Sequence, residues 1–134
     1  MADVIKTGAV HHLTITVTDV ARSARFYQGL LNFQPVAELG ERQILHNGAT
    51  LLVLGTPPDP AQAIAGDRFD ENRVGLDHLS FAVDSRQDLE DAVDLLDREG
   101  ISHGEIKDLG EGLGIYVLAF RDPDNVQLEL TAPR

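Results

Sequence analysis

The chain has 134 residues, and its 22 acidic and 11 basic side chains give a formal net charge of −11. That length suits one domain, and a hydrophobic content of 43% supplies a core, which argues against disorder. The acidic balance argues against nucleic acid and anionic membranes as partners, and no stretch approaches the roughly 20 apolar residues of a membrane span, so we expect a cytoplasmic protein.

The first predicted strand covers residues 12–18, where polar and apolar side chains alternate. Its apolar face carries Leu13, Ile15 and Val17, and its polar face carries His12, Thr14 and Thr16. A helix is predicted over 23–31, with Asp19 or Ser23 as its cap. Three more strands are predicted near 35–39, at 42–46 and at 49–54. This order is a βαβββ module over about residues 7–55.

Residues 56–74 form a linker-like stretch rich in proline and acidic side chains. At about twenty residues it is longer than ordinary connections between elements. We interpret it as a strap between two modules, because joining modules needs reach. A lid over a site is the alternative.

The opening phrase His-Leu-Thr-Ile-Thr-Val of residues 12–17 returns as His-Leu-Ser-Phe-Ala-Val at 78–83. Two such copies in one short chain indicate an internal repeat. A helix is predicted over 88–99, ended by Gly100. Three strands follow, near 104–109, at 115–120 and at 126–132. The sequence therefore predicts a second βαβββ module over about residues 75–132, and an α+β fold in which both modules form a single domain, 1–134.

Strand parity brings three polar side chains to one concave surface. Each strand must place its apolar face on the helix of its module, so His12, His78 and Glu129 point the other way. A buried, unpaired carboxylate there would cost several kcal/mol or take up a proton, and a divalent cation removes that cost. Two imidazoles and one carboxylate are the ligand set of open transition-metal sites. Since the chain has no cysteine, nitrogen and oxygen must hold the metal.

The rest of this surface would form a mostly apolar pocket for a small molecule whose two neighbouring oxygens displace metal-bound water. Its predicted lining is Leu51 or Val53, Val117 and Ala119, with the hydroxyl groups of Thr14, Thr16 and Ser80. Glu129 is either a ligand only or also the catalytic base. Thr14 either orients a substrate oxygen or fills space beside a ligand.

Three further histidines and one glycine-rich segment are weaker candidates. By alternation, His11 is expected to face away from His12. His46 is expected to be exposed beside a turn, and His103, on a short polar strand, is a minor candidate for the lining. Residues 110–114 lead into a strand and not into a helix, so we interpret them as a flexible turn and not as a phosphate loop.

Nearly the whole chain resembles the vicinal oxygen chelate superfamily, which includes glyoxalase I, extradiol dioxygenases, fosfomycin-inactivating transferases and bleomycin-binding proteins. The resemblance rests on residues 12–19, 23–27, 30–33, 77–83 and 121–130. It implies two βαβββ modules that form a cup-shaped mixed sheet with the helices on the outer face. It also implies one divalent metal ion (Fe, Mn, Ni, Co or Zn) on the residues matching the family ligands, His12, His78 and Glu129.

The sequence departs from the named activities of this family. Leu52 or Val53 stands where glyoxalase I-like enzymes have a further carboxylate, which counts against their proton shuttle. Ala119 stands where dioxygenases and fosfomycin transferases usually have a tyrosine. We expect a divalent-metal-dependent enzyme of the glyoxalase/dioxygenase type, a lyase, an isomerase or an extradiol-type dioxygenase. The alternative is a metal-free drug- or metabolite-binding protein of the bleomycin-resistance type, which an aromatic content of 5% does not favour.

We also expect a homodimer, because paired-module proteins of this size often complete their cups across a twofold axis. In a swapped arrangement, His12 comes from one chain and His78 and Glu129 come from the other. The sequence leaves both this arrangement and a site within one chain open, and it leaves the substrate and the metal open too.

Overall fold

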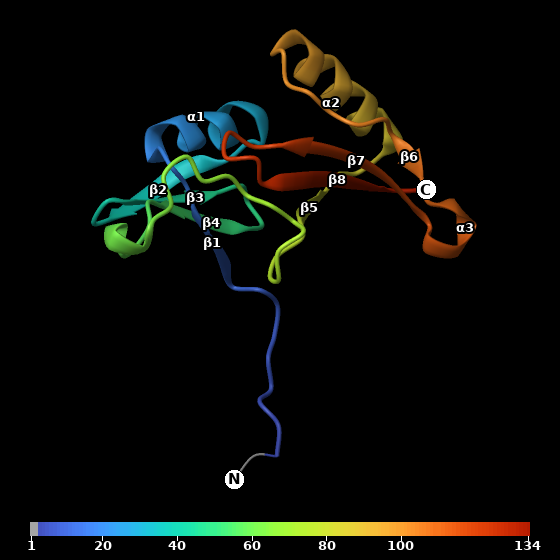
Figure 1. Cartoon of the computed structure of the whole chain (residues 1–134). Helices are drawn as coiled ribbons and strands as arrows, with labels where there is room; N and C mark the ends of the chain where they lie inside the picture. The colour runs from blue at the N-terminus through green and yellow to red at the C-terminus, as the bar shows by residue number, and fades with distance from the viewer. Residues whose placement is uncertain (1–2) are drawn as a thin grey trace. The chain divides into compact units, whose positions relative to one another are not determined.

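The computed structural model describes residues 3–134, and the chain divides between Ala65 and Gly66 into two compact units (Figure 1). Each unit is a four-stranded mixed sheet with a long helix on one face. Each follows the order strand, helix and three strands. The predicted α+β class with two βαβββ modules is confirmed.

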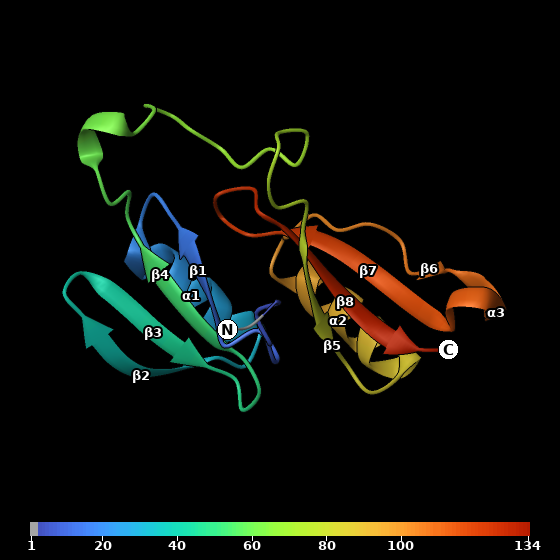
Figure 2. The same ribbon diagram turned by 90° about the horizontal axis from the view of Figure 1, so that it is seen from below.

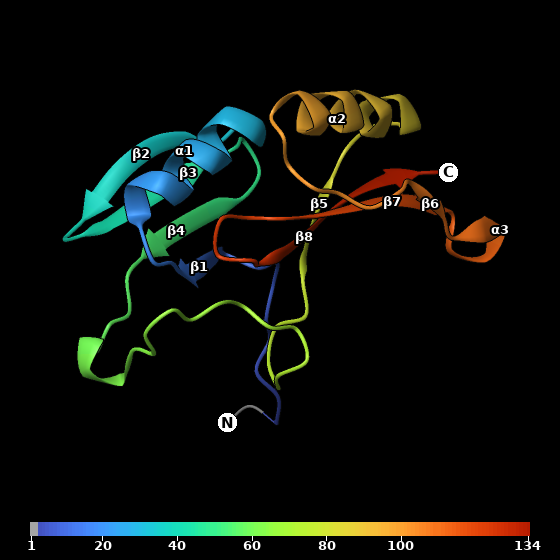
Figure 3. The same ribbon diagram turned by 45° about the horizontal axis from the view of Figure 1, so that its top comes forward.

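Unit 1, the part before Gly66, contains one module and a short 3-10 turn. Its elements are β1 (His12–Thr16), α1 (Val20–Leu30), β2 (Gln34–Leu39), β3 (Arg42–His46), β4 (Leu51–Gly55) and η1 (Pro60–Gln62). The strand order is β1-β4-β3-β2, and only β1 and β4 are parallel (Figure 2). The helix α1 packs on β3 and β4 (Figure 3).

The local chemistry of unit 1 explains these elements. Asp19 caps α1 by accepting a hydrogen bond from the backbone N–H of Arg22 at 3.1 Å. Asn32 follows the helix with a positive φ of 61°, a conformation that asparagine tolerates better than most residues. The core is closed by large apolar side chains, namely Tyr27, Phe33, Leu45, Leu52 and Leu54. Each contributes about 1.5–3 kcal/mol by leaving water.

Unit 2, from Gly66 onward, repeats the module with one extra helical turn. Its elements are β5 (Leu79–Ala82), α2 (Arg86–Arg98), β6 (Lys107–Asp108), α3 (Gly110–Leu113), β7 (Ile115–Arg121) and β8 (Gln127–Pro133). The strand order is β5-β8-β7-β6, with β5 and β8 parallel (Figure 2). The helix α2 packs on β7 and β8 (Figure 3). Its core is Leu79, Leu89, Leu96, Leu118, Phe120, Leu128 and Ala132.

Two predictions for unit 2 are wrong: the start of the helix at 88–99 and the turn at 110–114. The helix α2 begins two residues before Asp88, because Ser85 and Asp88 form a capping box that satisfies backbone N–H groups at the helix start. Gly110–Leu113 form the short helix α3, where a flexible turn was predicted. Gly114 ends this turn with φ 66° and donates its N–H to the carbonyl of Gly110 at 2.9 Å.

The second half of the predicted linker 56–74 packs on unit 2. Phe69 donates its N–H to the carbonyl of Asp124 at 2.9 Å, and the Asn125 amide nitrogen donates to the Phe69 carbonyl at 3.0 Å. This part of the linker is therefore attached to the turn between β7 and β8. Within residues 3–134, no helix is long and apolar enough to cross a membrane.

Candidate functional site

In unit 1, the strand β1 presents a polar face away from α1. Ile15 is buried, whereas His12, Thr14 and Thr16 are exposed, as the alternation predicts. Across the parallel pairing, Thr14 lies opposite Val53. Leu51 lies opposite His12 in the same way, so both predicted apolar residues stand beside the polar face of β1; Val53 is buried and Leu51 is half-buried.

In unit 2, strand pairing brings most of the predicted residues of this half together. Glu129 on β8 lies between Ser80 on β5 and Ala119 on β7. Thr131, the next residue of β8 on the same face, lies opposite Val117 on β7. The parity argument therefore holds for the second module, and Glu129 sits at the centre of the polar face of its sheet.

The pair His78 and Glu129 has the spacing of two ligands of one cation. Nε2 of His78 lies 3.8 Å from Oε1 of Glu129, which is too long for a hydrogen bond. Two atoms that each bind a cation at about 2.0–2.2 Å lie at most about 4.4 Å apart. The two side chains, 37% and 20% exposed, are therefore placed so that one ion fits between them and solvent reaches it.

Asp77 is a functional candidate that the sequence reasoning missed. Its Oδ1 lies 2.7 Å from Nδ1 of His78, and the amide nitrogen of Gln127 donates to the same oxygen at 3.1 Å. An acidic residue directly before the repeated histidine was the available signal, since neighbours of a ligating imidazole commonly orient it.

Hydroxyl groups lie next to the carboxylate of Glu129. The Thr131 hydroxyl donates to Oε1 of Glu129 at 3.4 Å, and the Ser80 hydroxyl is hydrogen-bonded to the Thr131 hydroxyl. Thr131 is not among the residues predicted for this site. The acid is therefore linked to a short chain of hydroxyls.

The surroundings of His12 correct the prediction for His11. The two rings do not face apart, because their Nδ1 atoms lie 2.9 Å apart and the rings meet edge to face. Both residues are exposed at the start of β1, where the neighbouring imidazoles can turn toward each other. Within either unit, over residues 3–134, no three His, Asp or Glu side chains gather as a metal-binding group.

The remaining histidines have local partners. His46 is half-buried, and its Nδ1 accepts a hydrogen bond from the N–H of Gly48 at 3.0 Å. His103 bonds the Gly104 carbonyl through Nδ1 and the Asp97 carboxylate through Nε2. Both contacts raise the pKa of His103, and the Gly104 carbonyl has the larger effect. His103 thus ties its loop to α2.

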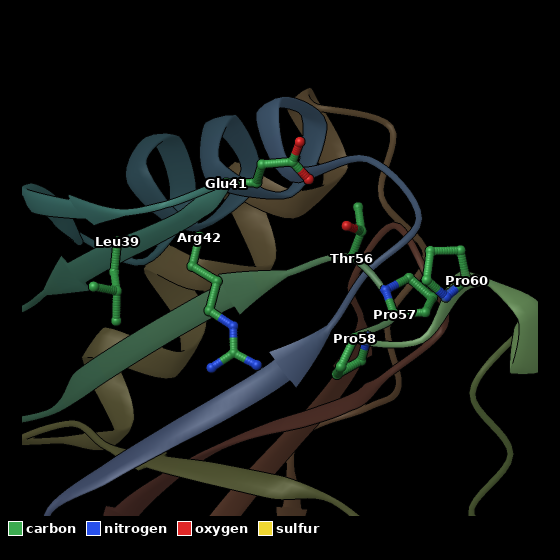
Figure 4. A pocket seen from close by; sticks show the side chains of 7 residues that line it. All are labelled: Leu39, Glu41, Arg42, Thr56, Pro57, Pro58 and Pro60. Atoms are coloured by element: carbon green, nitrogen blue, oxygen red, sulfur yellow. The ribbon is translucent and has the colours of Figure 1, made fainter.

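A separate cavity lies in unit 1, with a volume of about 420 Å³ (Figure 4). It is lined by Leu39, Glu41, Arg42, Thr56, Pro57, Pro58 and Pro60. Figure 4 shows the Arg42 guanidinium directed away from the Glu41 carboxylate. The predicted metal ligands are not among its lining residues.

Two βαβββ modules in one chain define the class of fold, and a histidine begins β1 in the first module and directly precedes β5 in the second. The family model for the Glyoxalase/Bleomycin resistance protein/Dioxygenase superfamily matches residues 9–130. The chain belongs to this superfamily, as the resemblance in the sequence implied.

Individual relatives agree with this assignment. The chain is 30% identical to the Bacillus subtilis (strain 168) protein YwkD over 91% of this chain and 94% of that protein. A solved glyoxylase/bleomycin resistance protein/dioxygenase domain from Frankia sp. EAN1pec is 31% identical, with a TM-score of 0.79 and coverage of 96% and 94%. A mutant of the fosfomycin resistance protein FosX from Listeria monocytogenes, complexed with Mn(II) and 1S,2S-dihydroxypropylphosphonic acid, shares the fold at 18% identity, with a TM-score of 0.74 and coverage of 96% and 93%.

Proposed function

We propose that the protein is a divalent-metal-dependent enzyme whose ligands are His12, His78 and Glu129. Its substrate is a small molecule that binds the metal through two neighbouring oxygens. The observation that carries the proposal is the 3.8 Å separation between Nε2 of His78 and Oε1 of Glu129. Ala119 and the hydroxyl residues Ser80 and Thr131 lie beside this carboxylate on the sheet.

Further observations support this ligand set. His12 begins β1 as His78 precedes β5, and both lie on faces turned away from the helices. The related fold of FosX holds Mn(II) together with a small dihydroxy phosphonate. His12 completes a set of two imidazoles and one carboxylate, which leaves positions open for substrate. Iron, manganese, nickel, cobalt and zinc all accept these ligands.

The predicted residues of the two units would divide the work around the substrate. A bound divalent cation supplies Lewis acidity, which stabilises negative charge on a substrate oxygen. Glu129, which accepts a hydrogen bond from Thr131, would serve as a ligand only or would also take a proton from the substrate. Thr14, Thr16 and Ser80 offer hydroxyls for orientation. Val53, Val117 and Ala119 contact the apolar part of the substrate and keep water from it.

Metal analysis of the purified protein tests this proposal. We expect one equivalent of divalent metal after reconstitution, with calorimetric affinity abolished in His78→Ala and Glu129→Ala and strongly reduced in His12→Ala. His46→Ala is the matched control, because His46 is a strand histidine outside the proposed set, and its affinity should equal that of the wild type. No stoichiometric metal under any reconstitution condition would defeat the proposal and favour a metal-free binding protein.

The assembly and the location belong to the same proposal. We propose a homodimer in which the cup is completed within one chain or across the twofold axis, and a cytoplasmic protein. A mixed dimer of His12→Ala and His78→Ala chains separates the two arrangements. A shared site recovers half of its metal capacity in mixed dimers, whereas a site within one chain recovers none. A monomeric mass at micromolar concentration would contradict the dimer.

A further inference from the structure

We propose that Asp77 is a positioning residue that fixes the tautomer and the ring orientation of His78. The inference rests on the proposed metal site, since it concerns which nitrogen of His78 is presented to the ion. Oδ1 of Asp77 lies 2.7 Å from Nδ1 of His78. An ionised carboxylate only accepts hydrogen bonds, so Nδ1 must carry the proton. In the neutral imidazole, Nε2 is then unprotonated and directed at Glu129.

Asp77 is itself held in place by Gln127 on β8. The amide nitrogen of Gln127 donates to Oδ1 of Asp77 at 3.1 Å, and its amide oxygen accepts from Nη2 of Arg121 at 2.9 Å. Because its oxygen faces a donor and its nitrogen faces an acceptor, the amide has one favourable orientation. Gln127 therefore transmits the position of Arg121 to Asp77.

Arg121 is held in turn by Glu71, which lies in the predicted linker 56–74. The two guanidinium nitrogens Nη1 and Nη2 bond the two carboxylate oxygens of Glu71, and Nη1 also donates to the Asn125 carbonyl at 3.2 Å. Two parallel bonds fix the plane of the guanidinium as well as its position. The hydrogen bonds from Arg121 lower the pKa of Glu71 to about 2, so the pair stays charged at neutral pH.

These contacts form one continuous relay inside unit 2, from Glu71 through Arg121, Gln127 and Asp77 to His78. The backbone contacts of Phe69 to the β7–β8 turn fasten the same segment. The second half of the linker therefore acts as a brace for a ligand. This role is distinct from a strap that only connects modules and from a lid that closes over a site.

The first test reads the His78 tautomer in the metal-free protein. Two-bond ¹H–¹⁵N correlation spectra at about pH 8.5, two units above the ordinary histidine pKa of about 6.5, distinguish a protonated Nδ1 from a protonated Nε2. We expect the Nδ1–H form in the wild type and in Asp77→Asn, which keeps an acceptor oxygen. Asp77→Ala should show a mixture of tautomers. A dominant Nε2–H form in the wild type would overturn the inference.

The second test measures Mn(II) and Zn(II) affinity by calorimetry. Outer partners of ligating histidines change metal affinity by about 10–100-fold, so we expect a loss of this size in Asp77→Ala. A smaller loss is expected in Gln127→Ala and a partial recovery in Asp77→Asn. Asp94→Ala is the matched control, because it removes the same charge from the exposed surface of α2 in the same unit. Equal affinities of Asp77→Ala and the control would overturn the positioning role.

The two tests separate this inference from the proposed function. If the wild type binds no metal while His78 keeps the Nδ1–H form that Asp77→Ala loses, the metal site fails and the orienting role of Asp77 stands. If the wild type binds metal through His78 and Asp77→Ala changes neither tautomer nor affinity, the metal site stands and the role of Asp77 fails.

Discussion

The two units share one frame but carry different side chains on it. In each unit, a histidine begins the phrase of the first strand, and a hydroxyl residue follows two positions later. In unit 1 that hydroxyl residue, Thr14, lies opposite Val53. In unit 2 its counterpart, Ser80, lies opposite Glu129. The repeat therefore keeps its register, while the acid at this position of the last strand is present in unit 2 and replaced by valine in unit 1.

The partners of the two histidines also differ, because only the histidine of unit 2 has a carboxylate partner. Nδ1 of His12 meets the imidazole of His11, whereas Nδ1 of His78 meets the carboxylate of Asp77. Two imidazoles can exchange the donor and acceptor roles, but a carboxylate only accepts. The partner of His78 in unit 2 therefore fixes which nitrogen carries the proton, whereas the partner of His12 in unit 1 does not. The comparison shows that two copies of one module can keep the same strand pairing while only one copy carries the carboxylates, Asp77 and Glu129, beside its histidine.

The largest expected effect comes from making unit 1 resemble unit 2. Val53→Glu introduces a carboxylate at a position that is 8% exposed, so we expect the free energy of unfolding to fall by about 2–5 kcal/mol. Burial raises the pKa of such a carboxyl, so the folded state holds the proton more tightly and stability falls as pH rises. Urea unfolding should show a greater loss at about pH 8 than at about pH 5.

Val53→Gln is the control for this change, since it has nearly the same size without the charge. Its loss of stability should be the same at both pH values. A Val53→Glu loss that is equally independent of pH would show that the valine position is open to water. The contrast between a buried apolar position in unit 1 and the carboxylate of Glu129 in unit 2 would then be wrong.

The two helix caps give a smaller contrast. The helix α2 begins with a reciprocal capping box at Ser85 and Asp88, while α1 begins with Asp19 alone. Loss of an N-cap costs about 0.5–2 kcal/mol. We expect Ser85→Ala to cost about 1–2 kcal/mol and Asp19→Ala about 0.5–1 kcal/mol by urea unfolding. A larger loss for Asp19→Ala would contradict the view that α2 is the more firmly capped helix.

The smallest expected effect is the pH dependence of the stability that His103 contributes to unit 2. The pKa of His103 is raised by the Gly104 carbonyl and the Asp97 carboxylate. Its stabilisation is therefore fully present below the unfolded pKa of about 6.5 and is lost as pH rises through the folded pKa. His103→Gln should reduce stability by at most about 1 kcal/mol at about pH 5.5 and by less at about pH 8.5. The same loss at both values would contradict a charged His103.

Alternation and turn chemistry made most of the frame predictable from the sequence. The polar face of β1, the position of Glu129 on β8 and the two βαβββ orders follow from a period of two and from the repeat. The sequence left Leu52 or Val53 open as the residue that replaces the family carboxylate. The strand register resolves this choice, because Val53 pairs with Thr14 as Glu129 pairs with Ser80.

The misses have physical reasons as well. The relay from Glu71 to Asp77 joins residues about fifty positions apart through side chains, and periodicity carries no information on such pairs. The contact of His11 with His12 depends on rotamers at an exposed strand start, where alternation of the backbone does not fix the rings. Apolar spacing misplaces the start of α2, because the polar capping box at Ser85 and Asp88 lies before Leu89, the first apolar residue of the helix.

Anomalous diffraction from crystals grown with Mn(II) tests the central claim most directly. We predict one strong peak within about 2.3 Å of Nε2 of His78 and of a carboxylate oxygen of Glu129. The third protein ligand should be Nε2 of His12, from the same chain or from its partner. A peak that avoids both His78 and Glu129, or no peak at saturating Mn(II), would contradict the claim.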